Sequence, residues 1–359
     1  MTAAATITPN RFSAGRLPKW APWAILGASL AVSFAAFGII SAADGSELPA
    51  VGAAIVGALL YVVAVVAVSY LQEGRRKATD RFITALVVGA FVLAIIPLVS
   101  LAWTTIANGL VRFDLEFFSY SMRGIIGEGG GALHAIIGTL QITLVATLIS
   151  VPVGLLTSIY LVEYGRGALA KGITFVVDVM TGIPSIVAGL FAYALFSAVL
   201  GPGIRSGLAG AISLCVLMIP VVVRSSEEML RLVPNELREA SYALGVPKWL
   251  TILKVVLPTS IAGIVTGVVL AIARVIGETA PLLLTAGYIA SVNWDVFNDR
   301  MASLPLFVYQ SYRNWGGDVN SFADLDRAWT GALTLIIIVM ALNLIARLVA
   351  RIFAPKTGR

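Results

Sequence analysis

Residues 227–258 read EEMLRLVPNELREASYALGVPKWLTILKVVLP, and this stretch decides how the chain is organised. It is a long amphipathic segment between two apolar runs. Pro234 suits the first position of a helix, where its missing N–H costs nothing, and Gly245 suits the residue that ends one. Pro247 begins a second short helix, and Pro258 opens the next apolar run. The pattern predicts a short helix over 234–245, set apart from the hydrophobic segments.

The predicted helix has one face of apolar and small residues. Five side chains recur along it at helical spacing: Val233, Leu237, Ala240, Ser241 and Leu244. A short capped helix with such a face is shaped to enter a groove on a partner protein. The alternative is a plain re-entrant turn without a partner.

The segments on both sides of this stretch are strongly apolar. Hydrophobic residues make up 58% of the 359 residues and charged residues 12%, whereas an ordinary soluble domain carries about 25% charged residues. Lipid must therefore solvate much of the chain, and only helices satisfy the backbone of such long apolar segments. We predict an all-α integral membrane protein, a helical bundle of about eight transmembrane spans at 20–42, 50–71, 82–106, 135–162, 172–200, 207–226, 259–285 and 328–350.

Lysine and arginine set the orientation of a membrane protein, because they are enriched in its cytoplasmic loops. With the amino terminus inside, the inner segments hold eighteen of these residues and the outer segments six. We therefore predict that both termini and the 227–258 loop are cytoplasmic, and that the long loops 107–134 and 286–327 face outward. The aromatic residues of the second outer loop form either an interfacial belt or a docking surface for an extracytoplasmic partner. The run Gly129-Gly130-Gly131 is interpreted as a flexible connector.

The rest of the composition argues against other classes of protein. The formal charge of +6 is spread between the apolar runs, which is typical of a membrane protein and not of a nucleic-acid-binding one. Cys215 is the single cysteine and His134 the single histidine, so neither a disulfide within the chain nor a metal cluster is expected. The first apolar core is longer than that of a cleaved signal peptide, so we expect it to be retained.

The 227–258 stretch resembles the cytoplasmic loop of binding-protein-dependent ABC permeases, which reads E-A-A, three residues, G, nine residues, I, one residue, L-P. At the same spacing this chain has Glu239, Ala240, Ser241, Gly245, Val255, Leu257 and Pro258. Serine stands for the second alanine and valine for isoleucine, and both changes are conservative in size. In that family the loop forms the coupling helix that docks on the ATP-hydrolysing subunit, so the resemblance implies this role for these residues.

Two further stretches resemble the phosphate-specific branch of that family. Residues 181–189 read TGIPSIVAG, and residues 273–283 read ARVIGETAPLL, which looks closest to the smaller of the two paired phosphate permeases. The resemblance covers roughly residues 80–355. It implies a type I ABC importer core of six spans in a permease domain over 81–359, with 1–80 as an N-terminal extension of two extra spans.

The resemblance also implies a function and partners. The chain would be a permease subunit in the bacterial cell membrane that moves inorganic phosphate inward, with no catalytic residue, metal or cofactor of its own. A second homologous permease, two ATP-binding subunits that carry ATP and Mg²⁺, and an extracytoplasmic phosphate-binding protein would complete the assembly. The absence of a G-x-x-x-x-G-K-[ST] loop agrees with a separate ATPase. The alternatives are a permease for molybdate or sulfate, and a stand-alone channel or secondary transporter, which would need no docking loop.

Two charged residues in the seventh predicted span are candidates for the translocation pathway. Arg274 and Glu278 are four residues apart and would share a face of one helix. A charge at the bilayer centre costs about 2.5–3.5 kcal/mol, so both should face a polar interior or each other. The forked guanidinium suits an oxyanion. Either the two form a structural ion pair, or Arg274 contacts the passing anion and Glu278 offsets its charge.

The fifth predicted span carries helix-breaking residues. Pro184, beside Gly182, is expected to kink this helix and let another backbone approach it. Asp178 in the same span is expected to pair with a basic residue that the sequence does not identify.

Overall fold

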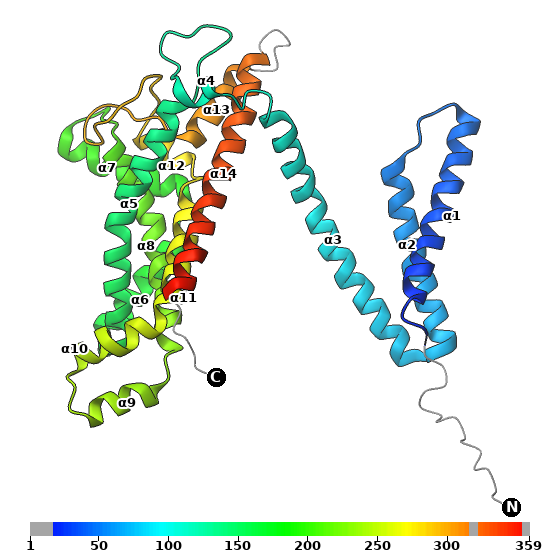
Figure 1. Cartoon of the computed structure of the whole chain (residues 1–359), viewed down its shortest axis with the longest axis horizontal. Helices are drawn as coiled ribbons and strands as arrows, with labels where there is room; N and C mark the ends of the chain where they lie inside the picture. The colour runs from blue at the N-terminus through cyan, green and yellow to red at the C-terminus, as the bar shows by residue number, and fades with distance from the viewer. Residues whose placement is uncertain (1–16, 316–321, 354–359) are drawn as a thin grey trace, which may run out of the picture. The chain divides into compact units, whose positions relative to one another are not determined.

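The computed structural model describes residues 17–315 and 322–353, and within these ranges every regular element is a helix (Figure 1). Contacts divide the chain into two compact units, Met1–Ala102 and Trp103–Arg359, which we call the N-terminal unit and the core unit. The predicted boundary between residues 80 and 81 falls inside α3 (Arg75–Gly109), which runs from the first unit into the second.

The N-terminal unit contains a helical hairpin of α1 (Ala21–Asp44) and α2 (Ala50–Glu73). Small residues let the two backbones approach: the Ser33 hydroxyl donates to the carbonyl of Ala53 at 2.6 Å, and a Cβ at Gly57 would lie 2.8 Å from a methyl carbon of Leu30. At the corner between α2 and α3, Arg81 forms an ion pair with Glu73 at 3.0 Å.

The core unit begins with the end of α3 and contains all the described elements that follow it. In chain order these are α4 (Leu115–Ser119), α5 (Leu133–Ile159) with the π-helical turn η1 (Tyr160–Tyr164), α6 (Gly167–Thr181), α7 (Ser185–Leu200), α8 (Gly207–Arg231), α9 (Asn235–Ala243), α10 (Lys248–Thr251), the π-helical turn η2 (Ile252–Val256), α11 (Leu257–Val275), α12 (Ala280–Thr285), α13 (Leu304–Trp315) and α14 (Phe322–Phe353).

Helix α8 lies at the centre of the core unit, and α5, α6, α7 and α11 pack against it. The hydroxyl of Ser206 caps its first turn by accepting the N–H of Ala209. Close packing again depends on small residues, since a Cβ at Gly154 of α5 would lie 2.7 Å from a methyl carbon of Val222. In the most apolar 18-residue stretch of α8, 67% of the residues are buried, whereas in that of α5 with η1 the share is 33%. The outer helices thus present apolar side chains outward, as a lipid environment requires.

Seven described helices are long and apolar enough to cross a membrane, and the bent pair α6–α7 makes eight if it counts as one span. This agrees with the eight predicted segments, with two corrections at the seventh. Its helical run begins at Lys248 and ends at Val275, not at residues 259 and 285. Pro258 therefore lies inside a continuous helical run. The π-helical turn η2 ends two residues before it, and this widened turn accommodates the missing N–H and the bulk of the proline ring.

Candidate coupling helix and translocation residues

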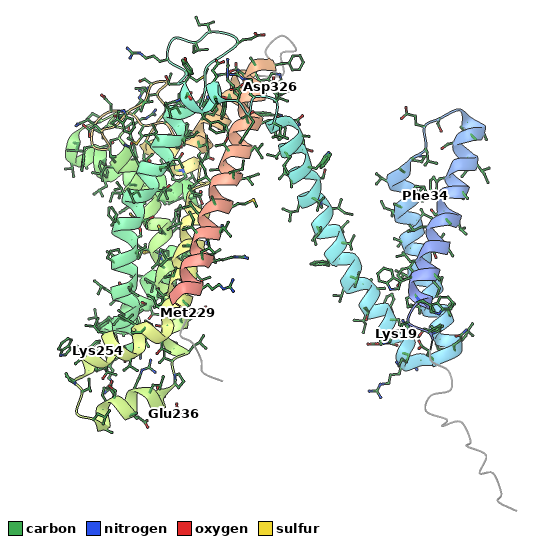
Figure 2. The ribbon with its side chains drawn as sticks, in the orientation of Figure 1. Lys19, Phe34, Met229, Glu236, Lys254 and Asp326 are labelled. Carbon is green, nitrogen blue, oxygen red and sulfur yellow. The ribbon has the colours of Figure 1, made fainter. Side chains whose placement is uncertain are left out.

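The helix expected over residues 234–245 is present as α9. Pro234 precedes its first residue in an extended conformation, and Gly245 ends it with a φ of +77°, the left-handed region that favours glycine. Figure 2 shows Glu236 of α9 at the same end of the core unit as Lys254 of η2, and Asp326 of α14 at the opposite end. We call these the α9 end and the α14 start of the core unit.

The predicted apolar face of α9 is divided between the inside and the surface. Val233 and Ser241 are buried, whereas Leu237, Ala240 and Leu244 are exposed. The residues turned outward form the candidate docking surface; Leu244 is 84% exposed. The single face expected from spacing is therefore corrected to two, because a helix lying across a bundle contacts its own chain on one side.

The motif residues follow the same division. Glu239, Ala240 and Gly245 are exposed on or after α9. The hydroxyl of Ser241 lies 2.8 Å from that of Thr251, so the serine in place of alanine links α9 to α10. Leu257 packs in a small core with Leu230, Val233, Val256 and Ile264, and Pro258 at the start of α11 is exposed. Glu239, Ala240 and Gly245 are available to a partner, whereas Ser241 and Leu257 hold the loop on the bundle.

Sequence reasoning missed a buried ion pair beneath α9. Both Nε and Nη2 of Arg238 contact Glu163 Oε1, at 3.0 and 2.9 Å, and Lys248 donates to the backbone carbonyl of Glu163. The signal that could have found Arg238 is its position three residues before Ser241, which places both side chains on the inward face of α9.

The break in the fifth predicted span is sharper than a kink. Helices α6 and α7 meet at an angle of 111°, and the break between them spans Gly182 to Pro184, the residues singled out in the sequence. A Cβ at Gly189 would lie 2.6 Å from the Cα of Pro281, so α7 packs directly on α12. The two phosphate-branch stretches, 181–189 and 273–283, therefore meet in space, although α8, α9, α10, η2 and most of α11 lie between them in the chain.

Arg274 and Glu278 were expected to lie on one helix and to share a face, and the structure corrects this expectation. Helix α11 ends at Val275, and Glu278 follows that end, with its N–H donating to the carbonyl of Val275 at 3.1 Å. The two side chains therefore do not share a helical face. Arg274 is exposed, Glu278 is half-buried, and no ion pair joins them within the described ranges. Gly277 and the nearby Pro281, both poor residues for a helix interior, explain the early end of the helix. A role in translocation remains a prediction for both residues.

Asp178 has the basic partner that was expected. Its carboxylate accepts from Nη2 of Arg224 on α8, and Arg224 Nη1 also contacts Glu227 at 2.8 Å. Glu227 in turn accepts from Arg231 at 2.7 Å. This chain of charges joins α6 to α8 beside a pocket of about 420 Å³, which Lys171 also lines.

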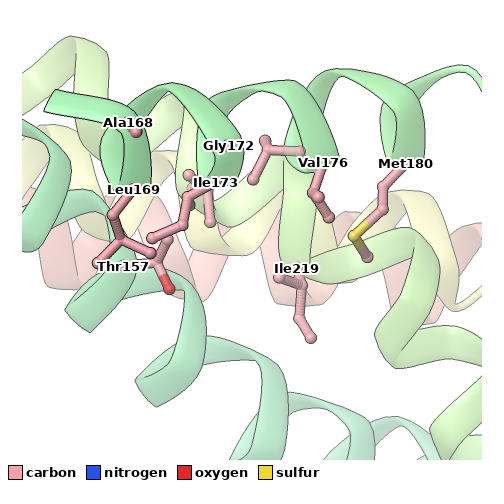
Figure 3. Close-up of a pocket in the computed structure, with 10 residues that line it drawn as sticks. Thr157, Ala168, Leu169, Gly172, Ile173, Val176, Met180 and Ile219 are labelled. Carbon is pink, nitrogen blue, oxygen red and sulfur yellow. The ribbon is translucent and has the colours of Figure 1, made fainter.

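A larger pocket of about 730 Å³ lies on the other side of α6, between α5 and α8 (Figure 3). Leu169, Ile173, Val176, Met180 and Ile219 line it, with Thr157 as the one polar side chain. Such a lining cannot solvate an oxyanion, so this pocket is a groove for apolar groups and not a phosphate site.

At the α14 start of the core unit, two arginines hold the glycine-rich loop. Arg112 donates to the carbonyls of Gly129 and Gly130, and the fully buried Arg327 donates to those of Gly127 and Gly129. The run 129–131, which was expected to be a flexible connector, is irregular backbone, and these side-chain hydrogen bonds contact two of its carbonyls. Its neighbour His134 is buried with Nε2 3.3 Å from the hydroxyl of Tyr288, and Cys215 is buried near the carbonyl of Ala146.

Comparison with known proteins now defines the class. The family described as the binding-protein-dependent transport system inner membrane component matches residues 150–359. One chain in the crystal structure of a bacterial alginate ABC transporter, in complex with an alginate pentasaccharide-bound periplasmic protein, shares the fold. Its TM-score is 0.56 at 14% identity, over 78% of this chain and 97% of that one. The chain belongs to the family of binding-protein-dependent transport system inner membrane components.

Individual relatives are more specific. Phosphate transport system permease protein PstA 1 of Mycobacterium tuberculosis (strain ATCC 25618 / H37Rv) is 49% identical over 288 residues, which cover 79% of this chain and 91% of that protein. Phosphate transport system permease protein PstA of Pasteurella multocida (strain Pm70) is 41% identical over 285 residues, or 79% and 97%. The resemblance stated from the three motifs is confirmed, as is an all-α, multi-pass membrane fold of the ABC permease type.

Proposed function

We propose that this protein is the permease subunit of an ABC importer that moves inorganic phosphate into the cytoplasm. The observation that carries the proposal is the 49% identity to a phosphate transport system permease protein over 91% of its length. The close approach of the two phosphate-branch stretches at Gly189 and Pro281 supports the same assignment. Molybdate and sulfate, also tetrahedral oxyanions, are the competing cargoes.

The partners follow from the coupling helix and from the family. A second homologous permease completes the pathway, two ATP-binding subunits hold ATP and Mg²⁺, and an extracytoplasmic phosphate-binding protein delivers the cargo. The exposed residues Glu239, Ala240 and Leu244 of α9 dock in a groove of one ATP-binding subunit. Hydrolysis takes place on those subunits, and this chain contributes the pathway and its coupling.

The α9 end of the core unit is placed in the cytoplasm, as the lysine and arginine distribution predicts. Both termini then lie inside and the loops 107–134 and 286–327 outside. Of the basic residues behind this orientation, Arg11, Arg16, Lys356 and Arg359 lie outside the described residues.

Passage of the anion is assigned to the break between α11 and α12. Arg274 is exposed at the end of α11, where its fork can contact a phosphate oxygen, and the half-buried Glu278 lies just beyond the helix end. Glu278 lowers the net positive charge of this region, so phosphate binds weakly enough to leave. Breaks at Gly182–Pro184 and at 276–279 allow the short helices α7 and α12 to shift without unfolding the long ones.

The test is uptake of radiolabelled phosphate by cells that lack their own importer and produce this chain with its partner subunits. Uptake should require the ATP-binding subunits. It should also persist when molybdate or sulfate is present at about a hundredfold excess over phosphate. Competition by molybdate would reassign the cargo. Uptake that persists without the ATP-binding subunits would identify a channel or secondary transporter.

A further inference from the structure

A fully satisfied arginine lies where α9 joins the bundle. The side chains of Arg238 and Glu163 are 12% and 5% exposed, and their closest atoms are 2.9 Å apart. Arg238 Nη1 also donates to the carbonyl of Val233 at 2.6 Å and to the Asn235 side chain at 3.3 Å, and Nη2 donates to the carbonyl of Leu230 at 3.0 Å. All five N–H donors of the guanidinium are thereby used.

These contacts join three separate elements. Leu230 belongs to the last turn of α8, Val233 to the segment between α8 and α9, and Glu163 to η1 at the end of α5. A lysine would keep the charge but could not occupy all five positions in a plane. The arginine therefore fixes α9 to the ends of both central helices at once.

A second connection reaches the same turn of α5 from the far side of the loop. Lys248 of α10 donates to the carbonyl of Glu163 and lies 4.7 Å from the ring centre of Tyr164. Both α9 and α10 are thus attached to residues 163 and 164 of η1. A π-helical turn is rare and is often found at functional sites.

We propose that Arg238 and Glu163 form the link that carries displacement of α9 into α5, and so couple ATP hydrolysis to opening of the pathway. The inference rests on the proposed function and adds to it a pair that is not part of the docking surface. Displacement applied to the exposed side of α9 reaches the bundle through this buried pair. Helix α5 then carries it along α8, against which it packs closely at Gly154. Both are positioning residues, since neither contacts the cargo.

The test compares transport with hydrolysis in the complete complex, reconstituted in lipid vesicles with phosphate-loaded binding protein. The variant is Arg238→Gln combined with Glu163→Gln, which leaves no unpaired buried charge and so avoids the large penalty of a single replacement. We expect normal yield of the assembled complex and continued ATP hydrolysis. Phosphate transported per ATP should fall by about tenfold, a typical coupling between linked sites.

Two comparisons make the result decisive. Arg231→Gln is the matched control, because Arg231 is 65% exposed and its ion pair with Glu227 lies within α8 alone; its transport per ATP should equal that of wild type. Arg238→Lys should give an intermediate ratio. An unchanged ratio in the double variant, or loss of assembled complex in parallel with hydrolysis, would overturn the link. Failure of the wild-type complex to transport phosphate would instead reject the proposed function.

Discussion

Gly245 shows how one residue controls the coupling helix. Its φ of +77° ends α9, and a Cβ there would meet no atom within 4 Å. The requirement for glycine is therefore one of backbone conformation and not of space.

Replacing Gly245 by valine should impair coupling while leaving membrane insertion intact. A β-branched residue in the left-handed region costs about 1–3 kcal/mol, so the end of α9 should rearrange. Co-purification with the ATP-binding subunit and phosphate uptake should both fall. Gly245→Asn is the matched control, because asparagine tolerates this conformation and should retain most of both. Equal behaviour of the two variants would show that the backbone conformation is unimportant.

Arg274 tests conduction separately from folding. Arg274→Gln removes an exposed charge that has no ion-pair partner within the described ranges, so the complex should still assemble. Uptake should fall by about tenfold or more, since a hydrogen bond to a charged ligand contributes about 1.5–3 kcal/mol. The measurement is uptake per assembled complex. Adding Glu278→Gln should not restore it, whereas recovery to the wild-type rate would make the two residues a structural pair.

At the scale of elements, the contact between α7 and α12 brings the two phosphate-branch stretches together. Prolines lie on both sides of this contact: Pro184 precedes α7, and Pro281 lies in the first turn of α12. Each proline suits the start of its helix, because its missing N–H costs nothing there. Their packing depends on Gly189, which has no side chain to separate them.

Gly189→Val should therefore push α7 away from α12. The added Cβ would lie 2.6 Å from the Cα of Pro281, which is backbone and cannot turn aside. Overpacking of this kind costs about 1–3 kcal/mol, so the melting temperature of the purified complex and phosphate uptake should both fall. Gly172→Ala on α6 is the control, because a Cβ there would meet no atom within 4 Å. A stable, active Gly189→Val variant would exclude a tight α7–α12 contact in the assembled transporter.

At the scale of the whole molecule, orientation depends on charges spread along the entire chain. Each single segment contains few lysines and arginines, so the orientation is favoured only by comparing their total over all inner segments with their total over all outer segments. The α9 end of the core unit carries Arg238, Lys248 and Lys254, and the opposite end carries arginines as well, among them Arg112 and Arg327, so no single pair of segments decides the orientation.

Labelling of single cysteines should test this orientation in a Cys215→Ser background. Ile126 is 98% exposed at the tip of the first long loop, so Ile126→Cys should react with an impermeant thiol reagent in intact cells. Lys77→Cys, exposed at the start of α3, should react only after permeabilisation. The neighbouring Ala78 is 4% exposed and unsuitable for labelling. The opposite pattern of labelling would invert the topology.

The sequence by itself determined the helical membrane fold, the approximate spans, and α9 with its ends at Pro234 and Gly245. These are local properties, because apolar length, helical period and the backbone limits of proline and glycine act within a few residues. The break at Gly182–Pro184 was predictable for the same reason. Its bend of 111° was not, since the packing of α7 on α12 sets that angle.

Only the tertiary structure decided which charges pair and which faces are buried. Asp178 meets Arg224 and Arg238 meets Glu163 across 46 and 75 residues of chain, separations at which spacing carries no information. Arg274 and Glu278 illustrate the converse, because their helical spacing predicted a shared face and α11 ends between them. A charged residue is held where distant helices place an opposite charge and exclude water, and that depends on packing of the whole bundle.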